Sequence, residues 1–423
     1  MRLIKLNIYC VSFSLFLLTG LASAQEKPDV TYASADNIAL KSLYETRQWV
    51  ELYEALKHSK GPALYRGAVA VTFNDNPRQA ERLLRSVIKS APHSDEAYQA
   101  YEWLAHLYLY SGQYQRLISS MEERWAAFPD RSAVPQERAE MAGFRGLPDQ
   151  IVSQHRPSTI RHETESIFIP LTINGVSATY FFDTGAWPSC LTESEAKRFG
   201  LTINDAAGSL GTMTTARVGF RTAVAKELTI GNVHFRNVSF VVFPDDQEPW
   251  SGVPPGRRGI LGIPILHGLR TLRWSKDDTV EIGFKSASLD VRKANLYFDN
   301  NHLVLVARFQ QQKILATLDT GAESTDLYGG FAKQFASFLS ASGKQGSTEV
   351  RGVGHTQSYD SITVPELRFQ VGGVETALRP AHILLNHEGT KCCIGNFGLD
   401  LLKQVPAFKI DFGAMRLTLE AKH

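Results

Sequence analysis

Two copies of one tetrapeptide are the residues of this sequence whose types and spacing could do chemistry. Asp-Thr-Gly-Ala occurs at Asp183 to Ala186 and again at Asp319 to Ala322. Amide hydrolysis without a covalent intermediate needs a base that activates water and an acid that protonates the departing nitrogen. Two carboxylates held close together cannot both ionise, so they can share these tasks. The sequence therefore predicts that Asp183 and Asp319 act as a pair that titrates jointly.

The surroundings of the two motifs are also repeated. Each copy follows a strand-like run, and each is followed by a helix-like segment, a Val-Gly pair and an apolar pair that ends on glycine. The spacing from Gly219 to Gly354 and the spacing from Gly262 to Gly395 both agree closely with the spacing of the two aspartates. A polar turn explains one such motif, but two motifs in one frame predict an internal duplication.

These residues resemble those of the aspartic peptidases, and more closely the retropepsin-like branch, because Ala186 and Ala322 follow the two glycines. The resemblance covers both halves of the region from about Ile167 to Leu419. It implies a water-based mechanism at the two aspartates. An alanine in place of Ser or Thr removes a hydroxyl that could stabilise the ionised carboxylate, so we expect a less acidic pH optimum than in pepsin-like enzymes.

The same resemblance implies roles for the residues that support the aspartates. Thr184 and Thr320 are expected to hydrogen-bond across a pseudo-two-fold axis and to hold the two loops together. Gly185 and Gly321 would allow backbone amides to approach the carboxylates, because glycine has no Cβ in the way.

A hydrophobic-hydrophobic-Gly element from the same half braces each catalytic loop in such folds. These braces are expected at Ile260, Leu261 and Gly262 in the first half and at Cys393, Ile394 and Gly395 in the second. Glycine-rich stretches at residues 211–219 and 346–354 are expected to form flap hairpins that close over a substrate. The candidate flap residues are Gly211, Gly219, Gly352 and Gly354, although ordinary turns have the same composition.

The texture of the chain changes between residues 145 and 166. Before this range apolar residues recur at helical spacing, and after it short β-branched and aromatic runs alternate with Gly, Asn and Asp. We expect a multi-domain α and β protein, with a helical repeat-like domain followed by a duplicated, mostly-β acid-protease double barrel. The expected ranges are a signal peptide at 1–24, the helical domain at 25–145, a linker at 146–165, and peptidase lobes at 166–290 and 291–423.

The helical region has features of a repeat. Pro92 and Pro129 close two similar units, and their spacing is typical of a helical repeat. Trp103, Tyr108 and Gly112 resemble the tetratricopeptide pattern. Such an array can bind a peptide or a partner protein in a groove, or it can be a helical cap on the following domain.

The start of the chain, up to Ala24, resembles a secretory signal peptide. A basic start and a short apolar run lead to Ala22-Ser23-Ala24, so cleavage near Ala24 and export to the periplasm or the medium are expected, without a stable membrane anchor. Three cysteines then remain. Cys392 and Cys393 are adjacent and are not expected to bond each other, so buried free thiols, Cys190 included, are the preferred interpretation.

Several classes of function are disfavoured. The formal charge of +2 gives no general attraction for nucleic acid. No HExxH or GxSxG motif is present, which argues against zinc chemistry and a serine nucleophile, and no cofactor is expected. Trp187 after the first motif is bulkier than Glu323 after the second, so the two sides of the cleft should differ, with access restricted at Trp187.

The sequence thus predicts an exported aspartic endopeptidase that hydrolyses a peptide or protein substrate with water activated between Asp183 and Asp319. Because both motifs lie on one chain, the active unit should be a monomer. The alternative is a non-catalytic peptide-binding or assembly module, in which the helical groove recruits a protein partner and the peptidase-like cleft is silent.

Overall fold

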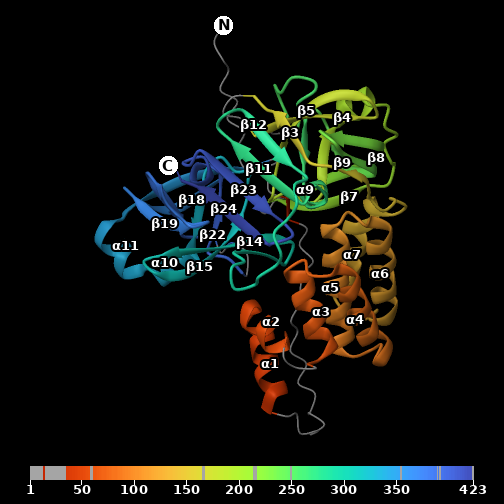
Figure 1. Cartoon of the computed structure of the whole chain (residues 1–423), viewed down its shortest axis with the longest axis horizontal. Helices are drawn as coiled ribbons and strands as arrows, with labels where there is room; N and C mark the ends of the chain where they lie inside the picture. Colours follow the sequence, from red (N-terminus) through yellow and green to blue (C-terminus); the bar gives the residue numbers. More distant parts are fainter. Residues whose placement is uncertain are drawn as a thin grey trace.

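The computed structural model describes residues 13–14, 35–57, 61–163, 167–212, 217–247, 250–352, 355–387, 389 and 392–421. These residues form a helical N-terminal part and a β-rich part that contains a closed barrel of six strands. The helices lie on one side of the β-rich part, and the two halves of the β-rich part lie side by side (Figure 1). Of the predicted signal peptide only β1 (Phe13–Ser14) is described. Ala24 and the candidate flap residue Gly354 lie outside the described residues.

The predicted helical character of the N-terminal region is confirmed. Its elements are α1 (Ala35–Glu45), α2 (Trp49–Lys57), α3 (Ala63–Thr72), α4 (Pro77–Ser90), α5 (Asp95–Tyr110), α6 (Tyr114–Ala127), α7 (Val134–Met141) and the 3₁₀ turn η1 (Ala142–Phe144). Two helix starts follow directly from sequence. The Asn76 side chain accepts a hydrogen bond from the backbone N–H of Gln79 ahead of Pro77, and Ser94 does the same for Ala97. The tetratricopeptide repeat stays a prediction.

The first β-rich half runs from β4 to β12. Its strands are β4 (Phe168–Ile173), β5 (Val176–Phe182), β6 (Ser189–Thr192), β7 (Gly208–Thr212), β8 (Arg217–Ile230), β9 (Val233–Phe243), β10 (Gly259–Leu261), β11 (Thr271–Ser275) and β12 (Thr279–Ile282), with helices α8 (Glu193–Arg198) and α9 (Ile263–Leu269). In β4 every second residue, Ile169, Leu171 and Ile173, is buried, as a strand with one inward face requires. The main sheet has the order β1-β7-β8-β4-β5-β10-β6-β9-β2.

The second β-rich half runs from β13 to β24. Its strands are β13 (Leu296–Asp299), β14 (His302–Phe309), β15 (Gln312–Leu318), β16 (Asp326–Tyr328), β17 (Lys344–Gly352), β18 (His355–Val364), β19 (Leu367–Val371), β20 (Val374–Leu378), β21 (Ala381–Leu384), β22 (Gly395–Phe397), β23 (Ala407–Asp411) and β24 (Arg416–Glu420), with helices α10 (Gly329–Gln334), α11 (Ala336–Ser342) and α12 (Leu399–Leu402). The main sheet has the order β17-β18-β21-β16-β22-β15-β14-β19-β20, with β13 paired to β14.

The range 146–165, expected to be a linker, carries two strands instead. β2 (Ile151–His155) pairs with β9, and β3 (Ser158–Arg161) pairs with β12. β2 lies at a sheet edge with exposed and half-buried side chains, so it lacks the alternation that identifies a strand in sequence. β3 belongs to a further sheet with the order β24-β23-β11-β12-β3, which joins the two β-rich halves.

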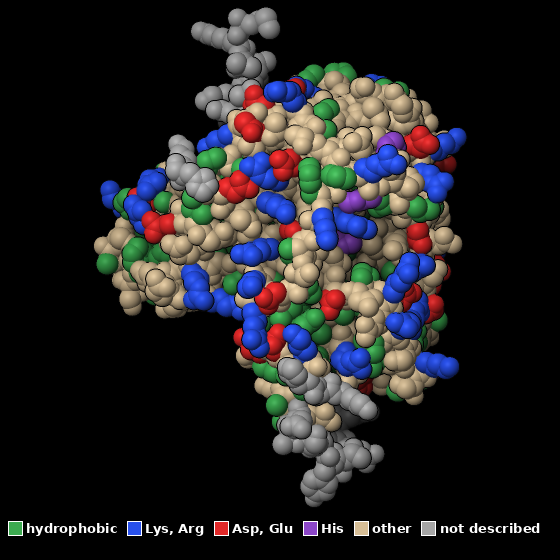
Figure 2. Space-filling model, viewed as in Figure 1, with side chains coloured by type: hydrophobic (Ala, Val, Ile, Leu, Met, Phe, Trp, Pro, Cys, Tyr) green, Lys and Arg blue, Asp and Glu red, His purple; other side chains and the backbone are tan. Residues whose placement is uncertain are grey.

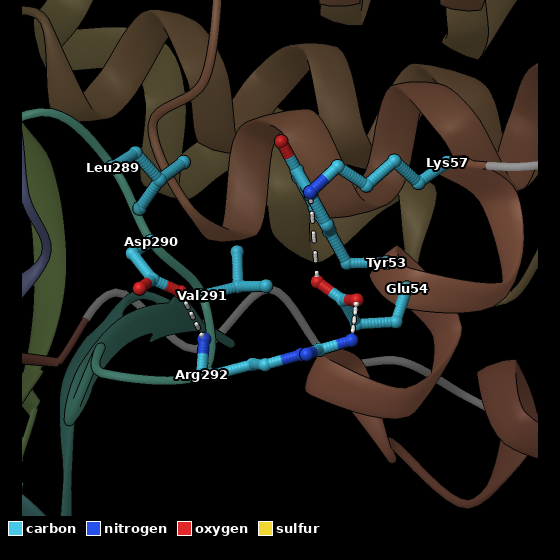
Figure 3. Close-up of a pocket in the computed structure, with 7 residues that line it drawn as sticks. All are labelled: Tyr53, Glu54, Lys57, Leu289, Asp290, Val291 and Arg292. Atoms are coloured by element: carbon cyan, nitrogen blue, oxygen red, sulfur yellow. Dashed lines mark hydrogen bonds and ion pairs between the residues drawn. The ribbon is translucent and has the colours of Figure 1, made fainter.

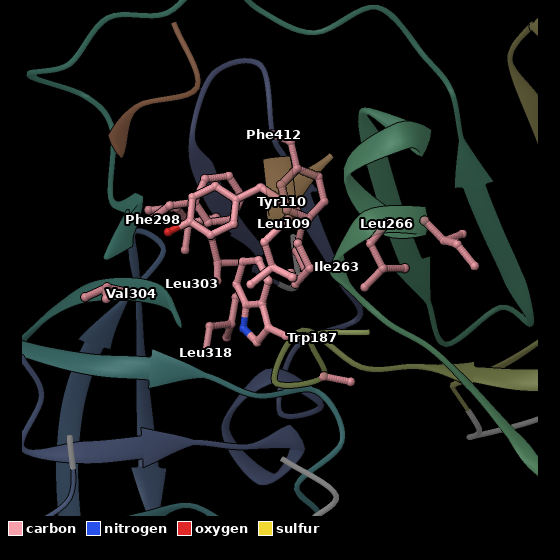
Figure 4. Packing of buried hydrophobic residues seen from close by; sticks show 14 of the residues in the cluster. Leu109, Tyr110, Trp187, Ile263, Leu266, Phe298, Leu303, Val304, Leu318 and Phe412 are labelled. Atoms are coloured by element: carbon pink, nitrogen blue, oxygen red, sulfur yellow. The ribbon is translucent and has the colours of Figure 1, made fainter. Parts of the chain in front are cut away.

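The helical part packs against both β-rich halves through one aromatic cluster. Tyr110, at the end of α5, lies with its ring centroid 4.6 Å from that of Trp187 and 4.2 Å from that of Phe298 (Figure 4). Arg47 adds an ion pair to the buried Asp299 at the end of β13. The expectation that Trp187 restricts access to the cleft needs correction, because its side chain is 0% exposed and forms part of the contact with the helices.

The cysteines also differ from expectation. Cys392 and Cys393 form a disulfide between adjacent residues, whereas Cys190 is a buried free thiol. The expectation rested on their adjacency alone, which does not prevent the bond. The interpretation as free thiols therefore holds for Cys190 only.

Neither sign of charge dominates the face of the molecule shown in Figure 2. On the face in Figure 2 the basic and acidic side chains are interspersed over the β-rich and the helical parts. Within the ranges given above, no helix combines the length and the apolar character needed to cross a membrane.

Candidate active site

The two aspartates begin equivalent loops at the ends of equivalent strands. Asp183 directly follows β5, and Asp319 directly follows β15. The backbone N–H of Asp183 donates to the carbonyl of Leu261 at 2.9 Å, and that of Asp319 donates to the carbonyl of Phe397 at the same distance. Both side chains are 0% exposed. The β5–β10 and β15–β22 pairings are parallel, so each loop is attached to a strand far away in sequence.

Thr184 and Thr320 join the two loops by reciprocal hydrogen bonds. The backbone N–H of each threonine donates to the hydroxyl of the other, and both distances are 3.0 Å. Each hydroxyl in turn donates to a carbonyl of the opposite half, Thr184 to Leu318 at 2.7 Å and Thr320 to Phe182 at 2.9 Å. The family resemblance implied such bonds between Thr184 and Thr320, and they tie the two aspartate loops together.

The brace of the second half lies further along the chain than its predicted position. Ile260-Leu261-Gly262 does brace the first loop, because Leu261 accepts from Asp183 and the residue after Gly262 donates to the carbonyl of Ala186. In the second half the equivalent contacts are made by Phe397 and by Leu399, which donates to the carbonyl of Ala322 at 2.8 Å. Residues 396–398 therefore brace the second loop, and the prediction of this brace at Cys393-Ile394-Gly395 is wrong.

Gly262 and Gly398 are the true counterparts. A Cβ on Gly262 would clash with the carbonyl oxygen of Ala186, and a Cβ on Gly398 would clash with that of Ala322. The N–H of Gly262 donates to the hydroxyl of Ser189, and the N–H of Gly398 donates to that of Thr325. The spacing from Gly262 to Gly398 equals that of the aspartates, whereas the spacing to Gly395 is slightly shorter, which is the sign of a slipped pairing.

The carboxylates accept hydrogen bonds from the glycines of their own motifs. Gly185 donates its N–H to Asp183 Oδ1 at 2.7 Å, and Gly321 donates to Asp319 Oδ1 at 2.9 Å. Ala322 also donates to Asp319 Oδ1, at 3.1 Å. A Cβ built on Gly321 would run into the Asp183 carboxylate, so the two motifs approach each other too closely for any larger residue there.

Asn396 is a site residue that the sequence analysis missed. Its side-chain N–H donates to Asp319 Oδ2 at 2.9 Å, and its Oδ1 accepts from the hydroxyl of Thr317. The side chain is 1% exposed. The spacing of the two aspartates, applied to Ile260, leads to Asn396, and this is the signal that could have identified it.

The electrostatics of the pair favour a shared proton. Burial raises the pKa of Asp183 well above its usual range, and the charge of Asp319 raises it further. Hydrogen bonds from the amides of Gly185 and Gly321 act in the opposite direction without reversing the effect. Asp183 therefore favours its protonated form beside the charge of Asp319.

Two further titratable groups lie beside the pair. Burial raises the pKa of Asp326 to about 7, with additional effects from the charges of Asp400 and Asp319. Burial likewise raises the pKa of Cys190, with Asp183 as a second cause. Cys190 and Asp326 have the same spacing as the two aspartates and occupy the same position in the two halves.

The candidate flap stretches form hairpins. β7 pairs antiparallel with β8, and Gly211 lies opposite Arg217 while Gly219 lies opposite Ser209. β17 pairs with β18, with Gly352 opposite His355 at the end of the ladder. The role of these hairpins as flaps stays a prediction.

A separate pocket of about 330 Å³ lies away from the pair, between α2 and the segment before β13 (Figure 3). Its lining residues are Tyr53, Glu54, Lys57, Leu289, Asp290, Val291 and Arg292. Arg292 and Lys57 both form ion pairs with Glu54. The described residues contain no group of three or more His, Cys, Asp or Glu side chains arranged to hold a metal ion.

Comparisons with known proteins found one family match and several similar solved structures. Residues 169–265 match the aspartyl protease family. Among solved structures, a retropepsin-like aspartic protease from Rickettsia conorii is 18% identical, with a TM-score of 0.22, and the match covers 31% of this chain and 93% of that one. The retroviral protease-like domain of Ddi1 from Leishmania major is 14% identical, with a TM-score of 0.20, and the match covers 28% of this chain and 88% of that one. No curated protein matches. The family match supports an aspartyl protease domain in the β-rich part.

Proposed function

We propose that this protein is an aspartic endopeptidase that hydrolyses peptide bonds with water activated between Asp183 and Asp319. The observation that carries the proposal is the buried carboxylate pair, held by the reciprocal bonds of Thr184 and Thr320. The family match to residues 169–265 supports the same class of hydrolase.

The chemistry requires one ionised and one protonated carboxyl. The water oxygen bonds to the substrate carbonyl carbon while the carboxylate takes a water proton and the carboxylic acid gives its proton to the carbonyl oxygen. When the C–N bond of the tetrahedral intermediate breaks, the proton taken from water passes to the nitrogen. The other carboxyl recovers its proton from a hydroxyl of the intermediate, and the pair returns to its starting state.

We also propose that the two β-rich halves arose by duplication and that one chain forms the complete site. Matched pairs of strands, such as β10 and β22 or β11 and β23, begin with the same spacing in the chain as the two aspartates. Both loops of the pair come from the same chain, so activity should not require a second copy. Export after cleavage near Ala24 completes the proposal, and secretion of the shortened chain tests it.

The central test compares Asp183→Asn and Asp319→Asn with the wild-type protein on a denatured protein substrate. Each variant should cleave about a hundredfold to ten-thousandfold more slowly than the wild-type protein, because each removes one partner of the acid–base pair. Asp130→Asn, at an exposed position of the helical part, is the matched control. Cleavage by either pair variant at the wild-type rate would overturn the proposal.

A statine-type mimic of the tetrahedral intermediate gives an independent measurement, because such a compound binds the transition-state geometry more tightly than a substrate does. Inhibition of the wild-type protein and weakened binding to both Asn variants are expected. A wild-type protein that neither cleaves a substrate nor binds the mimic from acidic to mildly alkaline pH would favour the alternative of a silent peptide-binding module.

A further inference from the structure

The strand residues next to the two aspartates differ in polarity between the two halves. In the first half, Ile260 lies in register with Phe181 on one neighbouring strand and with Cys190 on the other. Residues directly opposite each other on neighbouring strands project from the same face of a sheet. Phe181, Ile260 and Cys190 are all at most 2% exposed. The row beside Asp183 is therefore buried and apolar apart from one thiol.

The same three positions of the second half are polar. Asn396 lies in register with Thr317 and with Asp326, on the strands equivalent to those of the first half. Each of these residues follows its counterpart at the spacing of the two aspartates, and all three are buried. We call Thr317, Asn396 and Asp326 the polar row. The polar row lies beside Asp319 at the strand positions that carry Phe181, Ile260 and Cys190 in the first half.

The polar row delivers a hydrogen bond to one aspartate only. The Thr317 hydroxyl donates to Asn396 Oδ1, which leaves the amide N–H of Asn396 to donate to Asp319 Oδ2 at 2.9 Å. A carboxylate accepts but does not donate, so this orientation of the amide matches the ionised form of Asp319. Asp183 has no side-chain counterpart of this donor, because Ile260 occupies the equivalent position.

We propose that Asn396, oriented by Thr317, is a positioning residue that keeps Asp319 the ionised member of the pair. This inference rests on the proposed peptidase function and assigns its two roles. Asp319 takes the proton from water, and Asp183 carries the shared proton and gives it to the substrate carbonyl oxygen. The direction of the reaction cycle is thereby set by side chains that do not touch the substrate.

Asp326 limits the pH range in which this device works. The acidic groups that act on it are Asp319, Asp400 of α12 and the Tyr359 phenol of β18. Below pH 7 Asp326 is mainly protonated, so the row adds no negative charge beside Asp319. Above pH 7 its ionisation opposes the ionised form of Asp319, since like charges repel.

The test compares the pH profile of kcat/KM in Asn396→Leu and Thr317→Val with that of the wild-type protein. Loss of the donor should move the acidic limb to higher pH by about one unit in Asn396→Leu, because a hydrogen bond to a charged group is worth roughly that much. Thr317→Val keeps the shape of the side chain and should move the limb by about half as much. The effect should fall on kcat and not on KM.

Two variants separate this role from a structural one. Thr317→Ser keeps the hydroxyl and should recover the wild-type limb relative to Thr317→Val. Ile260→Val, at the position equivalent to Asn396, should leave the acidic limb where it is, because the side chain of Ile260 has no hydrogen-bond donor. An unmoved limb in both Asn396→Leu and folded Thr317→Val would overturn the inference while the loss of activity in Asp183→Asn and Asp319→Asn still supported the function.

Infrared difference titration of the carboxylic acid band gives a measurement that does not depend on catalysis. The band that disappears in Asp319→Asn should titrate at higher pH in Thr317→Val than in the wild-type protein, and it should return toward the wild-type pH in Thr317→Ser. If the wild-type protein cleaves nothing, the proposed function fails, and this titration alone decides the inference. An identical titration in all three proteins would overturn it.

Discussion

The two aspartate loops have similar backbone contacts but differ in the side chains next to them. Around Asp183 and Asp319 most backbone contacts match, including the carbonyls of Leu261 and Phe397 that accept from the aspartate amides, although the amide of Ala322 donates to the Asp319 carboxylate as well. The side chains beneath them are apolar in the first half and polar in the second. Backbone symmetry therefore brings the two carboxylates together, and side-chain asymmetry makes them chemically unlike. A symmetrical site could not assign the acid and the base to fixed residues.

The outer surfaces of the two catalytic loops differ for another reason. Trp187 follows the first motif and is buried against Tyr110 of the helical part, whereas Glu323 follows the second motif and is exposed. The first loop is thus held from outside by α5. Its geometry depends on the helical part in a way that the geometry of the second loop does not.

Removal of the Trp187 side chain should have the largest effect on stability. Trp187→Ala should lower the free energy of unfolding by about 3–5 kcal/mol, because it leaves a large cavity between the helices and the first loop. Glu323→Ala, at the equivalent exposed position, should change it by less than about 0.5 kcal/mol. Urea unfolding measures both values.

Trp187→Phe is the matched control for this pair of variants. The indole N–H of Trp187 makes no hydrogen bond in the structure, so a smaller ring should cost clearly less than alanine. Equal losses in Trp187→Ala and Glu323→Ala would mean that the two loops are supported in the same way, against the asymmetry described above.

The reciprocal threonines should show the symmetry of the halves. Thr184→Val and Thr320→Val each leave one buried N–H and one buried carbonyl without their hydroxyl partner, so each should cost about 2–4 kcal/mol. The two losses of unfolding free energy should agree within about 0.5 kcal/mol, because the two sets of hydrogen bonds are equivalent. Thermal or urea unfolding measures them. Serine at either position keeps the hydroxyl and should recover most of the loss. A strongly unequal pair would contradict the symmetric contact.

The smallest expected effect depends on pH and tests the polar half alone. The pKa of Asp326 rises from the usual range to about 7 on folding, so the folded state prefers the protonated carboxyl and loses stability as the pH rises from about 4 through 7. Asp326→Asn removes this loss. At pH 8 the variant should be more stable than the wild-type protein by on the order of 1–2 kcal/mol, after allowing for burial of the amide.

At pH 4 the two proteins should differ little, because Asp326 is then protonated in the folded state and about half protonated in the unfolded one. Urea unfolding at the two pH values measures the difference. Cys190→Ser, at the equivalent position of the first half, is the comparison variant and should not reproduce the pH dependence attributed to a carboxyl. A variant Asp326→Asn that is less stable than the wild-type protein at pH 8 would contradict the prediction.

The sequence predicts the N-terminal helical region and the strands that precede the aspartates, because both depend on local patterns. Asn76 and Ser94 cap helices by accepting from amides one turn further along. Phe181 and Phe182 form a strand end next to Asp183 on the chain itself. β2 could not be recognised, since an edge strand with exposed side chains has no burial pattern to reveal it.

The sequence by itself determined the identity of the paired groups: two Asp-Thr-Gly-Ala motifs on one chain, with threonines able to bond across them. Tertiary structure decided which neighbours those groups have. Asn396 reaches Asp319 because β22 pairs in parallel with β15, and Gly398 replaces Gly395 as the brace because of the register of that pairing. Register depends on hydrogen bonds between strands that lie far apart in the chain, and no local pattern fixes them.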